Sequence, residues 1–73
     1  MMKMTYQQFN YIIALLSSYE NYSKLSKKDY NKYSKIDDYF YKKFKDIDIE
    51  EASIIIKKLE KLYNINDKKW VNE

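Results

Sequence analysis

The N-terminal quarter of the chain carries apolar side chains at the spacing of an α-helix. They recur after three, one, three and three residues, which places them on one face of a 3.6-residue period. This face consists of Phe9, Ile12, Ile13, Leu16 and Tyr19. Most polar side chains of the segment, Gln8 among them, are expected elsewhere on the helix. The pattern predicts a helix over residues 5–19.

A second clear period runs from Asp48 to Tyr63. Its predicted buried stripe consists of Ala52, Ile55, Ile56, Leu59, Leu62 and Tyr63. Acids lead the segment and lysines follow, as the helix dipole favours. Asn64 and Asn66 are good breakers, since asparagine tolerates the left-handed conformation. The pattern therefore predicts a helix over residues 48–63 and a tail over 64–73.

The weakest pattern lies between these segments, where aliphatic side chains are few and charges are many. Two helix starts fit it. Either Ser26 caps a helix with Asp29 in its first turn, or a loop continues to Ser34 and a shorter helix follows. The shorter helix, residues 34–45, is the preferred prediction. Its expected inward side chains are Ile36, Phe40 and Phe44.

Two capping motifs of the same kind begin the outer helices. In Thr5-x-x-Gln8 and Asp48-x-x-Glu51, the cap oxygen can accept a free backbone N–H, and the later side chain can reach back to the cap. Each motif is flanked by an apolar pair at the spacing of a hydrophobic staple. These pairs are Met4 with Phe9 and Ile47 with Ala52.

The composition favours an all-α fold. The 73 residues include no Gly and no Pro, which helices tolerate and tight hairpins usually do not. With no Cys and no His, disulfides and the usual zinc sites are excluded. We therefore expect a single small three-helix domain over residues 1–73, supported by helix packing, self-association or a partner.

The helical positions also resemble a known pattern. They read Thr5-x-x-Gln8-x-x-x-Ile12-x-x-Leu15 in the first helix and Ala52-Ser53-x-x-Ile56-x-x-Leu59 in the third. This resembles a short helical domain of uncharacterised function in bacterial and phage proteins, found alone or as a tail on larger proteins. Some of those proteins act in DNA metabolism. The resemblance spans residues 5–62 through a handful of positions, implies no catalytic residues, and does not extend to the Lys/Tyr-rich middle.

The sequence gives no sign of an enzyme. The absence of His and Cys removes two of the commonest catalytic groups, and there is no glycine loop for phosphate. The acid pairs Asp37-Asp38 and Glu50-Glu51 fall in first helical turns in this interpretation, where the dipole explains them. No carboxylate cluster with calcium-loop spacing occurs. We therefore expect no catalytic residue, no metal and no cofactor.

Tyrosine and lysine in the middle of the chain form the candidate partner-binding surface. Tyrosine is favoured at protein interfaces, and the chain has nine. Tyr39 and Tyr41 flank Phe40, so they should point away from the core. The predicted surface consists of Tyr30, Lys32, Tyr33, Lys35, Tyr39, Tyr41, Lys42 and Lys43.

These features favour a non-enzymatic binding protein of a phage or mobile element. It would act by covering a host or viral protein, for example a defence nuclease inhibited by an anti-CRISPR protein. A nucleic-acid accessory module is an alternative, weakened because every one of the fourteen basic residues is Lys and none is Arg. A homodimeric scaffold is another. A cytoplasmic location with no membrane association is expected, and Trp70 is expected to fold back onto the core.

Overall fold

The protein is a three-helix, all-α domain. The computed structural model describes residues 2–18 and 26–63. Its helices are α1 (Tyr6–Ser17), α2 (Lys27–Lys43) and α3 (Ile49–Leu62), and the short 3₁₀ helix η2 (Phe44–Asp46) follows α2. This confirms the fold class that the hydrophobic pattern predicts. Expectations about Tyr19, Trp70 and the tail 64–73 fall outside the described residues.

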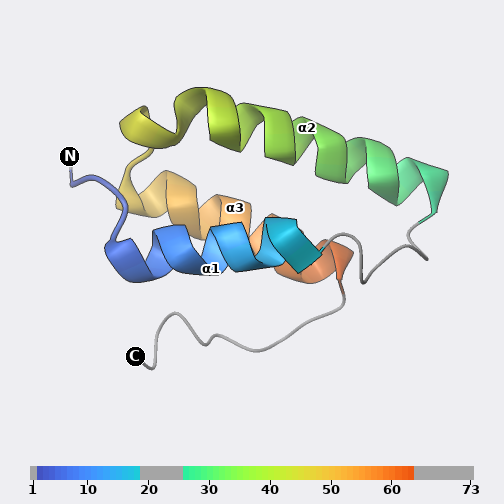
Figure 1. The fold of residues 1–73 in the computed structure, drawn as a ribbon, viewed down its shortest axis with the longest axis horizontal. Coiled ribbons are helices and arrows are strands. Elements are labelled where there is room, and N and C mark those ends of the chain that lie inside the picture. The colour runs from blue at the N-terminus through green and yellow to red at the C-terminus, as the bar shows by residue number, and fades with distance from the viewer. Residues whose placement is uncertain (1, 19–25, 64–73) are drawn as a thin grey trace.

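The helices lie roughly along one direction. In Figure 1, α1 and α3 run the same way, and α2 returns in the opposite direction along them. Helix α3 packs against both α1 and α2. None of the helices within residues 2–18 and 26–63 is long and apolar enough to cross a bilayer.

Helix α1 begins with the predicted capping box. The Gln8 backbone N–H donates to Thr5 Oγ1 over 3.0 Å, and the Thr5 N–H donates to Gln8 Oε1 over 3.0 Å. Two backbone donors at the helix start are thereby satisfied. Thr5 is the cap and Tyr6 the first helical residue.

Helix α3 begins at the predicted Asp48 cap, but the reciprocal half of the motif is absent, because the Glu51 carboxylate bonds Tyr39 instead of the Asp48 N–H. The N-terminal segment pairs with this helix start. The Glu51 N–H donates to Asp48 Oδ1 over 2.8 Å. Lys3 and Asp48 form an isolated antiparallel bridge. Its two hydrogen bonds run from the Met4 N–H to the Ile47 carbonyl and from the Ile49 N–H to the Met2 carbonyl, each 3.0 Å.

Helix α2 begins earlier than predicted. Ser26 is its cap, with Oγ accepting the Asp29 N–H over 3.2 Å, and Ser34 lies inside the helix. The preferred start at Ser34 was wrong, and the alternative start at Ser26 is the one observed. Tyr33 explains the difference, because it is buried and gives the first turns of α2 an anchor in the core that a loop would lack.

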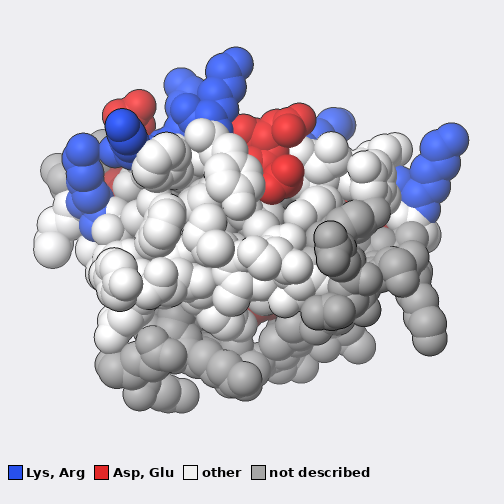
Figure 2. Space-filling view, viewed as in Figure 1, with Lys and Arg blue, Asp and Glu red and all other residues white. Residues whose placement is uncertain are grey.

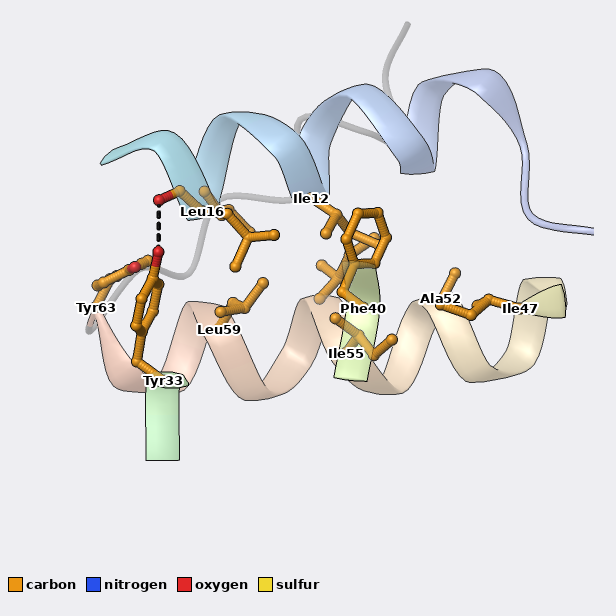
Figure 3. Packing of buried hydrophobic residues seen from close by; sticks show 11 residues of the cluster. Ile12, Leu16, Tyr33, Phe40, Ile47, Ala52, Ile55, Leu59 and Tyr63 are labelled. Atoms are coloured by element: carbon orange, nitrogen blue, oxygen red, sulfur yellow. Dashed lines mark hydrogen bonds between the residues drawn. The ribbon is translucent and has the colours of Figure 1, made fainter. Parts of the chain in front are cut away.

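The core lies where the three helices meet. Figure 3 shows its side chains in the space between α1 and α3, with Tyr33 and Phe40 contributed by α2. The buried apolar side chains are Ile12, Leu15, Leu16, Tyr33, Phe40, Ile47, Ala52, Ile55, Ile56, Leu59 and Tyr63. Met4, Phe9, Tyr11, Ile13, Ile36 and Leu62 pack against this cluster from its edge. Most of both predicted stripes is therefore in the core or beside it.

Two details of the predicted core need correction. Phe44 is 37% exposed, because α2 has given way to η2 at this residue and the chain is turning toward α3. Its ring still lies 6.2 Å from that of Phe9, at the edge of the core. Leu15, which the predicted packing stripe omitted, is buried.

Gln8 was expected among the outward polar residues, and it is completely buried. Its Nε2 donates to the Ile49 carbonyl over 3.2 Å and to Ser53 Oγ over 3.1 Å. The same amide oxygen accepts the Thr5 N–H, so one side chain joins the beginnings of α1 and α3. A buried amide is stable only with such partners.

Candidate functional site

Helix α2 carries all eight residues of the predicted partner-binding surface. A helix turns about 100° per residue, so residues this close in sequence point in several directions. The structure accordingly divides the eight among the core and different sides of α2. The predicted surface is not one continuous patch.

Tyr33 is a core residue, and its assignment to a partner surface is wrong. Only 9% of it is exposed, and its hydroxyl donates to the Leu16 carbonyl over 2.8 Å (Figure 3). That carbonyl lies in the last turn of α1, where the regular helical hydrogen bonds end. Its ring lies 6.3 Å from that of Tyr63. Tyr33 therefore ties α2 to the end of α1.

Lys32, Lys35 and Tyr39 lie on the side of α2 that faces α3. They line two adjoining hollows between these helices, of about 510 Å³ and about 360 Å³. Lys35 and Lys58 line both hollows, which therefore form one continuous feature. We call it the α2–α3 groove. Its lining residues are Asp29, Lys32, Lys35, Ile36, Tyr39, Glu51, Ile54, Ile55, Lys58, Lys61 and Leu62.

The α3 half of this groove was missed at the sequence level. Ile54 offers the one signal that could have pointed to it. In the run Ile54-Ile55-Ile56, only two consecutive side chains can belong to a narrow buried stripe. Ile55 and Ile56 are buried, whereas Ile54 is 53% exposed. Ile54 therefore lies at the surface, where it lines the groove together with Lys35 and Lys58.

Tyr30 and Tyr41 lie on another side of α2. They are eleven residues apart, close to three full turns, so they point in nearly the same direction. They are 45% and 53% exposed. The Tyr41 ring lies edge-on to that of Phe40, with 5.5 Å between the ring centroids. Lys42 and Lys43 are exposed in the last turn of α2.

A hydrogen bond joins α2 to the first turn of α3 across the groove. The Tyr39 hydroxyl donates to Glu51 Oε2. This bond is the largest cause that raises the pKa of Tyr39, followed by partial desolvation and by the negative charges of Glu51 and Asp48. Glu51 thus has two roles: its carboxylate accepts the Tyr39 hydroxyl of α2, and its backbone N–H donates to the Asp48 cap of α3.

Asp37 and Asp38 do not lie in a first helical turn, as the sequence-based interpretation required. They occupy the middle of α2, far from the favourable end of the dipole. Burial raises the pKa of Asp37, and the neighbouring charge of Asp38 raises it further. Glu50 and Glu51 do lie in the first turn of α3.

Charge is distributed unevenly over the molecule. Helix α1 contains no charged side chain from Tyr6 to Ser17. In Figure 2, lysines and acids gather along the outer edge of α2, and the broad area over α1 is white. No group of three or more acid, His or Cys side chains within residues 2–18 and 26–63 is placed to hold a metal ion.

Comparisons with protein-family models, with curated proteins and with solved structures found no match to this chain. The resemblance to a phage and bacterial helical domain stays a prediction.

Proposed function

We propose that this chain is a small non-enzymatic binding protein of a phage or mobile element. It acts by covering a functional surface of a host or viral protein. Inhibition of a defence nuclease, as by an anti-CRISPR protein, is one form that this action takes. The location consistent with this role is the cytoplasm of the host cell.

The observation that carries this proposal is the way α2 is held. Tyr33 and Phe40 anchor it from within, two turns apart, and Tyr33 also bonds α1. The exposed side chains on its other sides therefore sit on a fixed helix before any partner arrives. A surface ordered in advance loses less entropy on binding, which leaves more of the contact energy as affinity.

The exposed side chains of α2 are of the types that protein interfaces use. Tyr30, Tyr39 and Tyr41 are each between 43% and 53% exposed. Tyrosine is enriched in interfaces because it offers a large contact area and a polar end with few rotatable bonds. Lysines border these tyrosines and supply charge for orientation.

A nucleic-acid accessory module is the second candidate, favoured by the four lysines of the α2–α3 groove. A basic groove follows a phosphate backbone, but bases need aromatic rings on which to stack. The only aromatic residue that lines this groove in the described chain is Tyr39, whose hydroxyl is already bonded to Glu51. The remaining floor is aliphatic.

Affinity purification of the tagged chain from the organism that encodes it tests the proposal. We expect one protein to co-purify in a stoichiometric amount and to stay bound after nuclease treatment. The double variant Tyr30→Ser/Tyr41→Ser should reduce recovery by about tenfold or more, as loss of interface tyrosines does.

Tyr6→Ser is the matched control, because Tyr6 is 78% exposed on α1. It should leave recovery unchanged. Gel shifts with single- and double-stranded DNA and RNA separate the second candidate. A shift at low salt, together with no stoichiometric protein partner, would replace the proposal with the nucleic-acid role.

A further inference from the structure

The α2–α3 groove combines an aliphatic floor with a basic border. Ile36, Ile55 and Leu62 form its floor, with Ile54 exposed at the edge. The border consists of Lys32 and Lys35 on α2 and Lys58 and Lys61 on α3. Lysines therefore border the groove from both helices.

The charges along this groove do not cancel. Among the described residues, four lysines line it against two carboxylates, Asp29 and Glu51. Glu51 is already the acceptor for Tyr39. Like charges gathered around one low-dielectric surface repel one another and raise the local concentration of anions. The groove is therefore matched to a ligand that brings negative charge to its borders.

The floor decides which kind of anion fits. Isoleucine and leucine side chains give no flat face for stacking bases, and they gain most by covering other aliphatic side chains. An apolar floor between charged borders is the usual complement of an amphipathic helix, whose apolar stripe enters the groove while its flanks meet the rims.

The length of the groove sets the length of the ligand. Asp29 and Tyr39 are the lining residues of α2 that lie farthest apart, ten residues from one another. Ten residues of helix extend about 15 Å, so a ligand helix of three to four turns, about 12–15 residues, covers the groove.

We propose that the α2–α3 groove binds an acidic amphipathic helix of the partner protein. This rests on the proposed function, since it assigns the chemistry of the partner and adds a second contact on α2, beside the side that carries Tyr30 and Tyr41. The aliphatic stripe of the ligand covers Ile54, Ile36 and Leu62. Its flanking carboxylates lie against Lys32 and Lys35 on one border and Lys58 and Lys61 on the other.

Synthetic peptides provide the probe. One fluorescein-labelled peptide of about 14 residues carries leucines at helical spacing and glutamates on both flanks. A second has lysine in place of each glutamate, and a third scrambles the first so that no apolar stripe forms. An oligothymidylate of about 15 nucleotides represents nucleic acid. Fluorescence anisotropy measures binding to the full chain.

We expect the glutamate peptide to bind, and the lysine and scrambled peptides to bind about tenfold more weakly or less. Lys35→Glu/Lys58→Glu should weaken the glutamate peptide by about tenfold, because it turns two attractions into repulsions. Lys3→Glu/Lys45→Glu changes net charge equally on exposed sites outside the groove, and should change affinity by less than about threefold. Ile54→Gln should weaken binding severalfold, and circular dichroism verifies that each variant is folded.

Three results would overturn the proposal. The first is that the folded protein fails to bind the glutamate peptide. The second is that the two lysine double variants change the affinity for this peptide equally. The third is that the oligothymidylate binds more tightly than the glutamate peptide and loses affinity in Lys35→Glu/Lys58→Glu. If a cellular partner is captured equally well by Lys35→Glu/Lys58→Glu, the proposed function stands and this groove assignment fails. If the glutamate peptide binds as expected but no protein partner is found in the cell, the proposed function fails instead.

Discussion

Gln8 on α1 and Ser53 on α3 are joined by a hydrogen bond of 3.1 Å from Gln8 Nε2 to Ser53 Oγ. The residues are 45 positions apart, and the Gln8 side chain is completely buried. The bond therefore helps to set how α1 lies along α3.

Gln8→Ala should lower the free energy of unfolding by about 2 kcal/mol or more. The change removes the three hydrogen bonds of the amide to partly buried partners, and each buried group left unsatisfied costs about 1–3 kcal/mol. Urea unfolding followed by circular dichroism measures the loss. Asn10→Ala, an exposed position on the same helix, should stay within about 0.5 kcal/mol of wild type. Equal effects of the two changes would contradict the role assigned to Gln8.

Tyr33→Phe tests the link between α2 and the end of α1. The change removes only the hydroxyl that donates to the Leu16 carbonyl, so we expect a loss of about 1 kcal/mol. Tyr41→Phe is the matched change on an exposed tyrosine of the same helix, and should have almost no effect on stability. Thermal melts of both variants decide the point. A Tyr33→Phe protein as stable as wild type would remove this bond from the account of why α2 starts at Ser26.

The consecutive residues Ile54 and Ile56 form a matched pair for the core assignment. Ile56 is completely buried and Ile54 is 53% exposed. Ile56→Ala should cost about 2–5 kcal/mol, which approaches the whole stability of a small domain. Ile54→Ala should cost less, since about half of Ile54 stays in contact with water. A reversed order of the two variants in chemical denaturation would refute the packing of α3.

Hydrogen exchange tests the pairing of the N-terminal segment with the start of α3. The amides of Met4 and Ile49 are the donors of this pairing and should be protected. Lys3 and Asp48 are the non-hydrogen-bonded pair of the bridge, so the Lys3 amide points away from the partner segment and should exchange quickly. Amide exchange measured by NMR gives all three rates in one sample. Similar rates at Met4 and Lys3 would show that the bridge does not persist in solution.

Asp37 should make stability depend on pH in an identifiable way. Its folded-state pKa is raised above 3.8, so the folded protein favours the protonated carboxyl. Its stabilising contribution is then complete below the unfolded pKa and is lost as the pH rises through the folded pKa.

Asp37→Asn should therefore be more stable than wild type at about pH 7, by about a few tenths of a kcal/mol because the carboxyl is partly solvated. The difference should vanish below the ordinary pKa of Asp. Melting temperatures across the acid range test this, and Asp38→Asn should give a smaller gain, since it relieves only the charge repulsion. A wild type that is the more stable protein at about pH 7 would contradict the assignment.

The outer helices could be predicted because their signals are local. The bonds of the Thr5 and Asp48 caps join residues three positions apart, and the stripes around Ile12 and Ile56 follow one helical period. The start of α2 could not be decided locally. Ser26 and Ser34 offer similar caps, and the choice depends on Tyr33 reaching the distant Leu16 carbonyl.

The candidate site was less predictable than the fold. Composition pointed to Lys32, Lys35 and Tyr39. Nothing in the sequence separates them from Tyr33, which is a tyrosine like Tyr39 but is buried where Tyr39 is exposed. Their neighbours in the groove, such as Lys58 and Ile54, come from α3 and join them only through tertiary packing. A groove between two helices is not a property of either helix alone.

The N-terminal segment pairs with the start of α3, so residues that the ribosome makes first depend on residues that it makes much later. Helix α1 is made first, yet its main packing partner α3 begins more than thirty residues after α1 ends. At a synthesis rate of about 5–20 residues per second, the apolar stripe of α1 waits on the order of seconds before α3 can cover it. Since contacts between distant residues also slow folding, this helical protein is expected to complete its fold only after α3 has been made.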